Sequence, residues 1–274
     1  MSLVETDWLE KNLNKVVILD CSWHMPNTNR NGLKEYEFKH IPKAIFFDLD
    51  KNSKKDSDLP HMLVKINDWN KIVSRMGIKR EDRVVIYDNS DVLSSCRCWF
   101  NFIYFGHDPK LVHVLNGGFE KWLNEKKKVT NIIENIKISN YESFEKKELV
   151  KDKGNIDTNI QTKKFKLIDA RSKERFEGKV AEPRKGLRSG SIKDSVCIPF
   201  NECLQKDKTF KSQNELKIIF ESCLKNINDK NIVFSCGSGV TACVLALAYS
   251  IINDKYQPCI YDGSWAEYGI IKKT

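Results

Sequence analysis

The stretch "NIVFSCGSGVTACVLALAYS", residues 231 to 250, joins a short β-type run to a long uncharged segment through a loop that contains two glycines. Its run Ile-Val-Phe favours a buried strand. The segment from about Val240 onward has the length and composition of a buried helix. A strand that passes through a glycine loop into a helix is typical of α/β proteins. Cys236 therefore stands at the carboxyl end of a strand, where the sites of such folds lie.

Matching motifs recur along the chain in the same order and at a nearly constant distance. Asp20 of "VVILDCS" and Asp169 of "FKLIDARS" are 149 positions apart, Asp88 of "RVVIYDNS" and Cys236 of "NIVFSCGS" are 148 apart, and Asn116 of "VLNGGFEKW" and Asp262 of "IYDGSWAEY" are 146 apart. Self-similarity at a fixed period indicates a duplicated domain. Because one copy has a carboxylate where the other has a thiol, the cysteine does not serve a packing role that both copies share.

The duplication and the alternation of patterns predict the fold class. Each copy alternates Val- and Ile-rich runs with segments of helical period such as "INDWNKIVSRMG" and "QNELKIIFESCLKNI". We expect tandem α/β domains, each with a parallel sheet and helices on both faces. The predicted organisation is an inactive domain at residues 1–128, a polar linker at 129–145 and a catalytic domain at 146–274.

Composition narrows the classes of function. The 274 residues carry a net charge of +9, but the lysines lie beside acids and form no basic stripe interleaved with aromatics, so a solvated surface is favoured over a nucleic-acid site. The sequence has no apolar run of the ~18 residues that a membrane helix needs, and its first residues do not resemble a secretory signal. We expect a cytoplasmic protein with no membrane or nucleic-acid partner. The nine cysteines lack the spacing of a zinc site, so no metal is expected.

The loop after Cys236 is suited to hold an anionic sulfur. Gly237 and Gly239 permit turns in which successive N–H groups point inward, and the N-terminus of the following helix adds further donors. The loop lacks the Gly-Lys-Ser/Thr of a phosphate-binding Walker loop, and Ala242 stands where a cysteine phosphatase has its phosphate-binding arginine. Two interpretations remain, a nucleophilic cysteine or a turn with an inert buried cysteine. The strand end, the two glycines and the two hydroxyl residues of the loop together favour the first.

The loop resembles the active-site loop of the two-domain rhodanese-like sulfurtransferases. The resemblance extends over essentially the whole chain. The motifs that carry it, in family order, are "DCSWHMP" at 20–26, "KHIPKAIFFDLD" at 39–50, "LPHML" at 59–63, "NGGFEKW" at 116–122, "DARSKERFEG" at 169–178, "EPRKG" at 182–186, "CGSGVT" at 236–241 and "YDGSWAEYG" at 261–269.

The resemblance implies a nucleophilic role for Cys236. In the family this cysteine takes a sulfur atom from a donor, holds it as a persulfide and passes it to a thiol, such as that of thioredoxin, or to cyanide. No metal or organic cofactor is implied. The resemblance also implies a substrate-binding set, which consists of the carboxylate-binding arginines Arg175 and Arg184 and the loop residues Gly237, Gly239, Val240 and Thr241.

The same resemblance implies a proton relay. Ser238, His61 and Asp50 match a triad-like set in which the histidine passes a proton through the serine hydroxyl and the aspartate orients the ring. The first domain would supply Asp50 and His61, and the second would supply the cysteine loop. Thr241 is expected to donate a hydrogen bond to the sulfur or to cap the helix.

The charge of the loop predicts the donor. Thiosulfate-preferring relatives have cationic residues directly after the cysteine, which suit a dianionic donor. Here these positions are Gly237 and Ser238, so we expect the monoanion 3-mercaptopyruvate as donor, with release of pyruvate. Two alternatives stay open, a thiosulfate:cyanide sulfurtransferase (rhodanese) of the same fold and a non-catalytic module that binds a partner or RNA.

Overall fold

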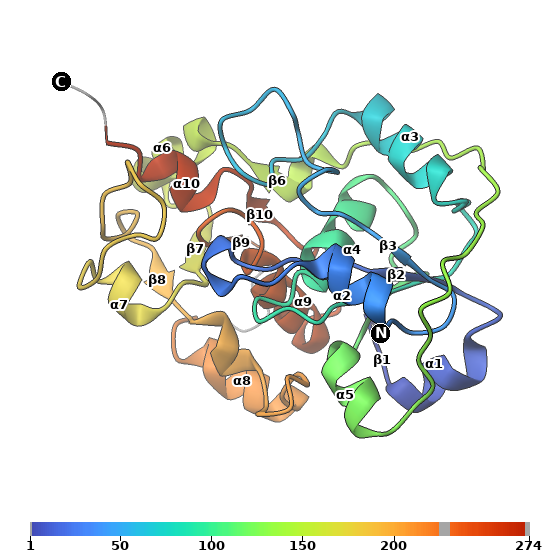
Figure 1. Cartoon of the computed structure of the whole chain (residues 1–274). Helices are drawn as coiled ribbons and strands as arrows, with labels where there is room; N and C mark the ends of the chain where they lie inside the picture. The colour runs from blue at the N-terminus through green and yellow to red at the C-terminus, as the bar shows by residue number, and fades with distance from the viewer. Residues whose placement is uncertain (1, 225–230, 272–274) are drawn as a thin grey trace. The chain divides into compact units, whose positions relative to one another are not determined.

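The computed structural model describes residues 2–224 and 231–271, and Figure 1 labels many of its helices and strands. The chain divides into two compact units that are not continuous in sequence. The first comprises the residues up to Lys55, Leu63–Lys146 and Lys206–Phe210. The second comprises Asp56–Met62, Lys147–Gln205 and the residues from Lys211 onward. The domain boundaries expected from the sequence, at 128 and 145, stay a prediction.

The first unit is a parallel five-stranded sheet in the order β1-β5-β4-β2-β3. Its strands are β1 (Leu3–Val4), β2 (Val17–Asp20), β3 (Ala44–Phe46), β4 (Val84–Tyr87) and β5 (Val112–Leu115). Its helices are α1 (Thr6–Asn12), η1 (Pro26–Thr28), α2 (Gly32–Phe38), α3 (Ile66–Arg75), α4 (Ser95–Tyr104) and α5 (Gly118–Asn124).

The second unit repeats this topology with the strand order β6-β10-β9-β7-β8. Its strands are β6 (Val150–Lys151), β7 (Lys166–Asp169), β8 (Val196–Cys197), β9 (Ile232–Ser235) and β10 (Ile260–Tyr261). Its helices are η2 (Lys147–Leu149), α6 (Lys153–Thr162), α7 (Lys173–Phe176), η3 (Phe200–Cys203), α8 (Gln213–Glu221), α9 (Ala242–Ile252) and α10 (Ser264–Tyr268). The two identical orders confirm the predicted fold class.

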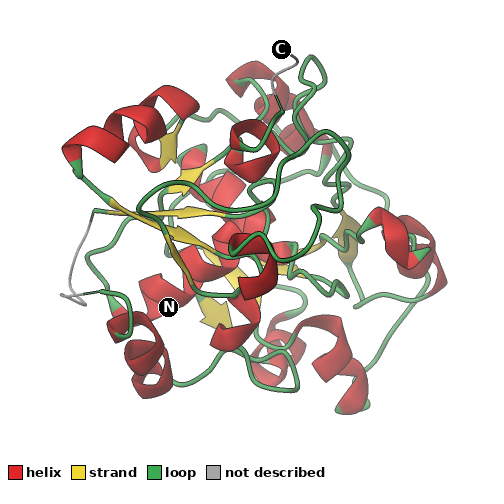
Figure 2. Cartoon of the chain, turned by 90° about the vertical axis from the view of Figure 1, so that its left-hand side faces the viewer, coloured by secondary structure: helices red, strands yellow, loops and turns green. Residues whose placement is uncertain are grey.

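Burial explains why the central strands lack the alternating pattern of a half-exposed strand. All four residues of β4 and of β9 are buried, as expected for parallel strands covered on both faces. Figure 2 shows the strands in yellow and the helices in red. The apolar helix predicted after the cysteine loop is α9, which begins at Ala242 rather than near Val240 and is buried through Tyr249.

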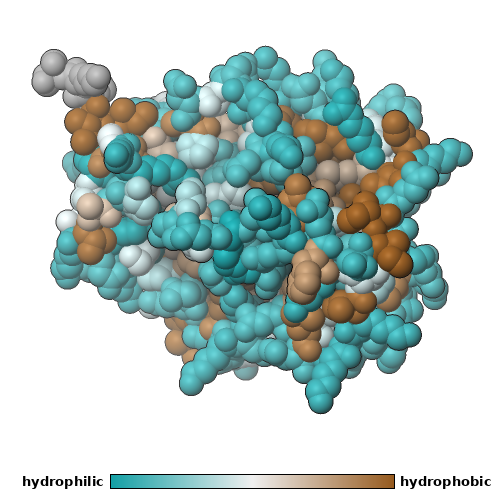
Figure 3. Space-filling view, viewed as in Figure 1, coloured by the Kyte–Doolittle hydropathy of each residue, from teal (hydrophilic) through white to brown (hydrophobic). Residues whose placement is uncertain are grey.

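The face of the molecule seen in Figure 3 is mostly hydrophilic, with scattered hydrophobic side chains. Within the described ranges, every helix is too short or too polar to cross a membrane.

A segment of the second half of the chain belongs to the first unit. Lys208 forms ion pairs with Asp91 and Glu120, at 3.0 and 3.1 Å. The backbone N–H of Phe210 donates to the side-chain oxygen of Asn116 at 2.9 Å. The first unit is therefore completed by residues that follow most of its own sequence.

Candidate active site

The cysteine loop begins where β9 ends, at the carboxyl edge of the second sheet. Cys236 directly follows Ser235, the last residue of β9, and α9 begins six residues later at Ala242. Cys236 and Ser238 are buried, at 2% and 6% exposed. Gly239 has a left-handed backbone with φ of +74°, which allows the loop to turn into the helix. The local structure is thus the strand, glycine loop and helix that the sequence predicts.

The N-terminus of α10 fixes the backbone of this loop. The N–H of Trp265 donates to the carbonyl of Cys236 at 2.9 Å, and the N–H of Ala266 donates to the carbonyl of Gly237 at 2.8 Å. In a planar trans peptide the N–H points opposite to the carbonyl, so the N–H groups of Gly237 and Ser238 are turned away from α10. Bonds from the neighbouring helix therefore orient successive donors toward one side of the loop, as an anion-binding nest requires.

Both predicted arginines lie beside Gly237. A Cβ atom built on this glycine would lie 3.3 Å from Nη2 of Arg175 and 3.7 Å from Nη1 of Arg184. Arg175 comes from α7, and Arg184 comes from the segment that follows it. Two guanidinium groups next to the residue after Cys236 make a cationic place for a carboxylate. Gly237 leaves room for them because it has no side chain.

A buried ionic network holds Arg175. The carboxylate of Glu182 accepts from Nη2 of Arg175 at 2.5 Å and from Nη1 of Arg171 at 2.7 Å. Arg171 in turn donates to Asp169, the last residue of β7, at 2.8 Å, and its guanidinium lies 4.3 Å from the centre of the Trp265 ring. The network links the end of β7 to α7 and to α10.

Arg171 stays charged although its side chain is only 1% exposed. Burial acts to lower the pKa of its guanidinium, but the hydrogen bonds and charges of Asp169 and Glu182 outweigh burial and raise it. Arg171 and Glu182 are not among the site residues predicted from the sequence. Their positions in the sequence could have indicated a role, because Arg171 of "DAR" lies two residues after Asp169 and Glu182 of "EPR" lies two residues before Arg184.

His61 belongs to the second unit and contacts the cysteine loop. Its Nδ1 lies 3.0 Å from the hydroxyl oxygen of Ser238, and Nη2 of Arg184 donates to the same oxygen at 3.4 Å. His61 is 4% exposed and has a left-handed backbone with φ of +60°. The structure thus places the hydroxyl of Ser238 between the histidine and one of the two arginines.

Asp50 belongs to the first unit, where its carboxylate accepts from the indole N–H of Trp23 at 2.9 Å. The pairing of Asp50 with His61 stays a prediction.

Val240 and Thr241 complete the loop. Val240 is buried, and Thr241 is the N-cap residue of α9. Within the described part of the chain the Thr241 side chain makes no capping hydrogen bond, so the capping alternative is wrong, and the bond to the sulfur stays a prediction. The thiol of Cys243 donates to the carbonyl of Gly239 at 3.2 Å and is thereby turned back against the loop.

Among residues 2–224 and 231–271, no group of three His, Cys, Asp or Glu side chains is placed to hold a metal ion.

The equivalent loop of the first unit holds a carboxylate in place of the thiol. The side chain of Asp88 accepts from the backbone N–H groups of Ser90 at 2.9 Å and Ser95 at 2.7 Å. Burial raises the pKa of this carboxyl group, while the bonds from the two serines act against the increase. Two backbone donors of this copy are therefore directed at a side chain of the protein itself, and the inactivity of this copy stays a prediction.

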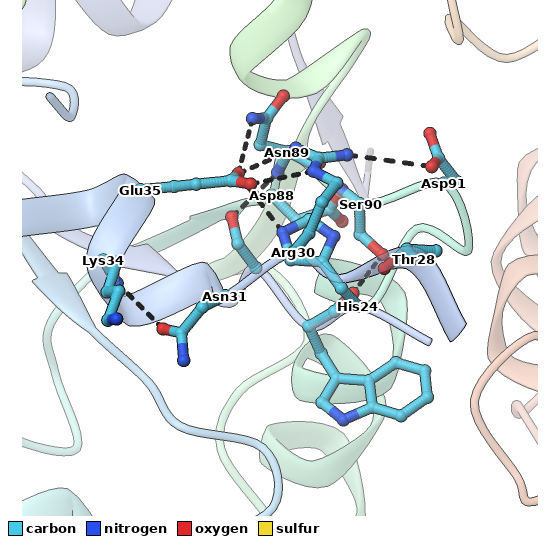
Figure 4. A network of polar contacts seen from close by, with 12 residues as sticks. His24, Thr28, Arg30, Asn31, Lys34, Glu35, Asp88, Asn89, Ser90 and Asp91 are labelled. Carbon is cyan, nitrogen blue, oxygen red and sulfur yellow. Dashed lines mark hydrogen bonds and ion pairs between the residues drawn. The ribbon is translucent and has the colours of Figure 1, made fainter. Parts of the chain in front are cut away.

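A second network lies beside Asp88 in the first unit (Figure 4). The Glu35 carboxylate receives two bonds from Arg30, at 2.7 and 2.8 Å, and one from the amide of Asn89 at 2.9 Å. Arg30 also donates to the carbonyl of Asn89 at 3.0 Å. The basic group of this network, Arg30, is thus held by the Glu35 carboxylate, as Arg175 is held by Glu182 in the second unit.

Comparison with known proteins agrees with this duplicated architecture. The family model described as "Rhodanese-like domain" matches residues 5–125 and again residues 152–270. The chain therefore belongs to the family of rhodanese-like domain proteins and contains two copies of the domain.

The chain spans three quarters or more of the length of the relatives that it matches. The chain is similar to thiosulfate/3-mercaptopyruvate sulfurtransferase 1, mitochondrial, of Arabidopsis thaliana, with 39% identity over 97% of this chain and 75% of the relative. It is 34% identical to the 3-mercaptopyruvate sulfurtransferase of Mus musculus, over 97% of this chain and 91% of that one. The crystal structure of SseA from Escherichia coli, a 3-mercaptopyruvate sulfotransferase, superposes with a TM-score of 0.86 at 28% identity, covering 97% of this chain and all of that one.

Proposed function

We propose that the protein is a sulfurtransferase that moves sulfane sulfur from 3-mercaptopyruvate to a thiol or to cyanide through a persulfide on Cys236. The observation that carries this proposal is the convergence of Arg175 and Arg184 on Gly237, the residue next to Cys236. Two guanidinium groups can each donate paired hydrogen bonds to the carboxylate and carbonyl oxygens of an α-keto acid. The donor's sulfur is then held at the cysteine.

The transfer step follows from this placement. The Cys236 thiolate attacks the sulfur of 3-mercaptopyruvate, an S–S bond forms, and the carbon–sulfur bond of the donor breaks. The electron pair of that bond stays on carbon as the enolate of pyruvate, and the proton of the donor thiol ends on this carbon. The inward-facing N–H groups of the loop stabilise the anionic persulfide. A thiol or cyanide then takes the outer sulfur and regenerates the thiolate.

Ser238 is suited to move the proton. Arginine is only a donor, so the contact from Arg184 uses a lone pair of the Ser238 oxygen. The hydroxyl proton is then directed to Nδ1 of His61, 3.0 Å away, in the tautomer that carries its proton on Nε2. A proton can pass between the histidine and the enolate through this hydroxyl. In this proposal Asp50 orients the His61 ring.

The principal test compares donors. Initial rates with 3-mercaptopyruvate and with thiosulfate are measured with cyanide and with reduced thioredoxin as acceptors. We expect a higher kcat/KM for 3-mercaptopyruvate, because the residues after the cysteine are uncharged. A higher kcat/KM for thiosulfate would identify the chain as a thiosulfate sulfurtransferase, an activity that the name of the Arabidopsis relative also includes.

A second test separates an enzyme from a binding module. After treatment with 3-mercaptopyruvate, intact-mass spectrometry is expected to show a gain of about 32 Da, one sulfur atom, that is absent from the Cys236→Ser variant. Salt-sensitive RNA binding without this adduct would favour the non-catalytic alternative.

The proposed location is the cytoplasm, with a protein thiol such as thioredoxin as acceptor. The location is tested by fractionating cells and probing the fractions with an antibody. Recovery in mitochondria, the organelle in the name of the Arabidopsis relative, would refute it.

A further inference from the structure

Ser264, the first residue of α10, has an unusual backbone for a residue with a side chain. Its φ is +48°, in the left-handed region, and the residue is fully buried. The left-handed region is unfavourable for residues other than glycine, and such residues concentrate at functional sites. The equivalent residue of the first unit, 146 positions earlier, is Gly118, with φ of +56°. The fold thus accepts glycine at this position in one copy and has serine in the other.

The hydroxyl of Ser264 connects the nucleophile's own backbone to the neighbouring strand. The N–H of Cys236 donates to Oγ of Ser264 at 3.1 Å, and this hydroxyl donates to the carbonyl of Tyr261 at 2.8 Å. Tyr261 is the last residue of β10, and Cys236 directly follows β9. One hydroxyl therefore joins two adjacent strand ends at the edge where the cysteine loop begins.

The first unit shows that the backbone arrangement does not require this hydroxyl. There the N–H of Phe119 donates to the carbonyl of Asp88 at 2.9 Å, as the N–H of Trp265 does to the carbonyl of Cys236 at the same distance. A Cβ atom on Gly118 would lie 2.6 Å from the carbonyl oxygen of Asp88, so a side chain is excluded in that copy. Serine is present only where the loop carries a cysteine.

We propose that Ser264 is a positioning residue for Cys236, an inference that rests on the proposed role of Cys236 as the nucleophile. Its hydroxyl holds the N–H of Cys236 while Trp265 holds the carbonyl, so the peptide groups on both sides of the cysteine are fixed. With both fixed, the direction in which the Cα–Cβ bond of the cysteine leaves the loop is fixed as well. Small errors in such a direction reduce the rate of a bimolecular attack strongly.

The test compares Ser264→Gly with Ser264→Ala. Both variants remove the hydroxyl, but only glycine relieves the left-handed backbone. We expect kcat with 3-mercaptopyruvate to fall about tenfold in both, because the cysteine is then held less well in the direction of attack. KM is expected to stay within about twofold, because Arg175 and Arg184 are unchanged. The glycine variant should melt above the alanine variant because glycine relieves the left-handed backbone, and a circular dichroism spectrum like that of the wild type separates the effect from misfolding.

A second measurement uses a reagent that has no carboxylate, so its reaction with Cys236 does not depend on binding to the two arginines. Alkylation of Cys236 by neutral iodoacetamide, followed by mass spectrometry of its peptide, should slow in both variants to a similar degree. Wild-type kcat in the glycine variant would overturn the proposal, since strain alone would then account for any loss in the alanine variant. A rise in KM at unchanged kcat would overturn it too. Failure of the proposed function itself is recognised separately, by a wild-type protein that forms no persulfide or a Cys236→Ser variant that keeps its activity.

Discussion

Replacing Glu182 by glutamine should destabilise the protein strongly with little change of shape. The Glu182 side chain is 1% exposed and is the common partner of Arg171 and Arg175. Removing one partner of a buried ion pair costs about 3–5 kcal/mol. The glutamine keeps a carbonyl acceptor, and one retained hydrogen bond offsets about 1 kcal/mol of this loss of stability. We therefore expect the free energy of unfolding to fall by about 3 kcal/mol.

The chain offers a matched control for this change. Glu177 forms an ion pair with Lys179 in which the two side chains are 46% and 70% exposed. Because exposed pairs contribute little, Glu177→Gln should change the free energy of unfolding by less than about 0.5 kcal/mol. Urea denaturation followed by circular dichroism gives both values, and the Glu182 effect should persist at high salt because the pair is buried. Equal effects of the two substitutions, or a Glu182 effect that salt abolishes, would refute the reasoning.

Three further results are expected. Burial raises the pKa of Asp20 to about 7, so the folded state keeps a proton that the unfolded state releases from about pH 4 upward, and the free energy of unfolding should fall between about pH 4 and 7. Asp20→Asn should remove about 4 kcal/mol of this decline in urea titrations at successive pH values, and an unchanged slope would contradict the assignment. Gly237→Arg should raise KM for 3-mercaptopyruvate about tenfold, because the new side chain crowds the two neighbouring arginines. In low salt it should also raise kcat/KM for thiosulfate relative to kcat/KM for 3-mercaptopyruvate, and an unchanged ratio of the two values would show that loop charge does not select the donor. Ser238→Ala should lower kcat with 3-mercaptopyruvate about 100-fold but leave thiosulfate turnover nearly unchanged, since sulfite needs no proton on carbon; equal losses with both donors would argue against a relay to His61.

The fold could be predicted because local patterns and the internal repeat agree. The apolar run before Cys236 predicts a buried strand, the glycines predict the turn, and the apolar segment after them predicts α9. The aspartates that end β2 and β7 mark equivalent strands, which have the same neighbours in their two sheets. Each of these features can be read within one short segment or by comparing two segments of the same chain, so one sequence is enough to identify them.

The parts of the site that the sequence did not predict depend on side-chain geometry. Nothing in the pattern "EPR" states that Glu182 reaches Arg175 rather than solvent. The left-handed backbone of Ser264 likewise could not be predicted from the sequence, because serine, unlike glycine, does not indicate a positive φ. Threonine is a common N-cap residue, but among the described residues the Thr241 hydroxyl does not bond to the first turn of α9.

The exchange of short segments between the two units has a consequence for how the protein is made. Translation delivers Asp56–Met62, with His61, long before the strands of the unit to which this segment belongs. The first unit, in turn, lacks Lys206–Phe210 until most of the chain has left the ribosome. Neither half, synthesised alone, contains a complete unit. A chain cut near residue 145 would leave a carboxyl-terminal fragment that carries Cys236 and both arginines but not the histidine beside Ser238.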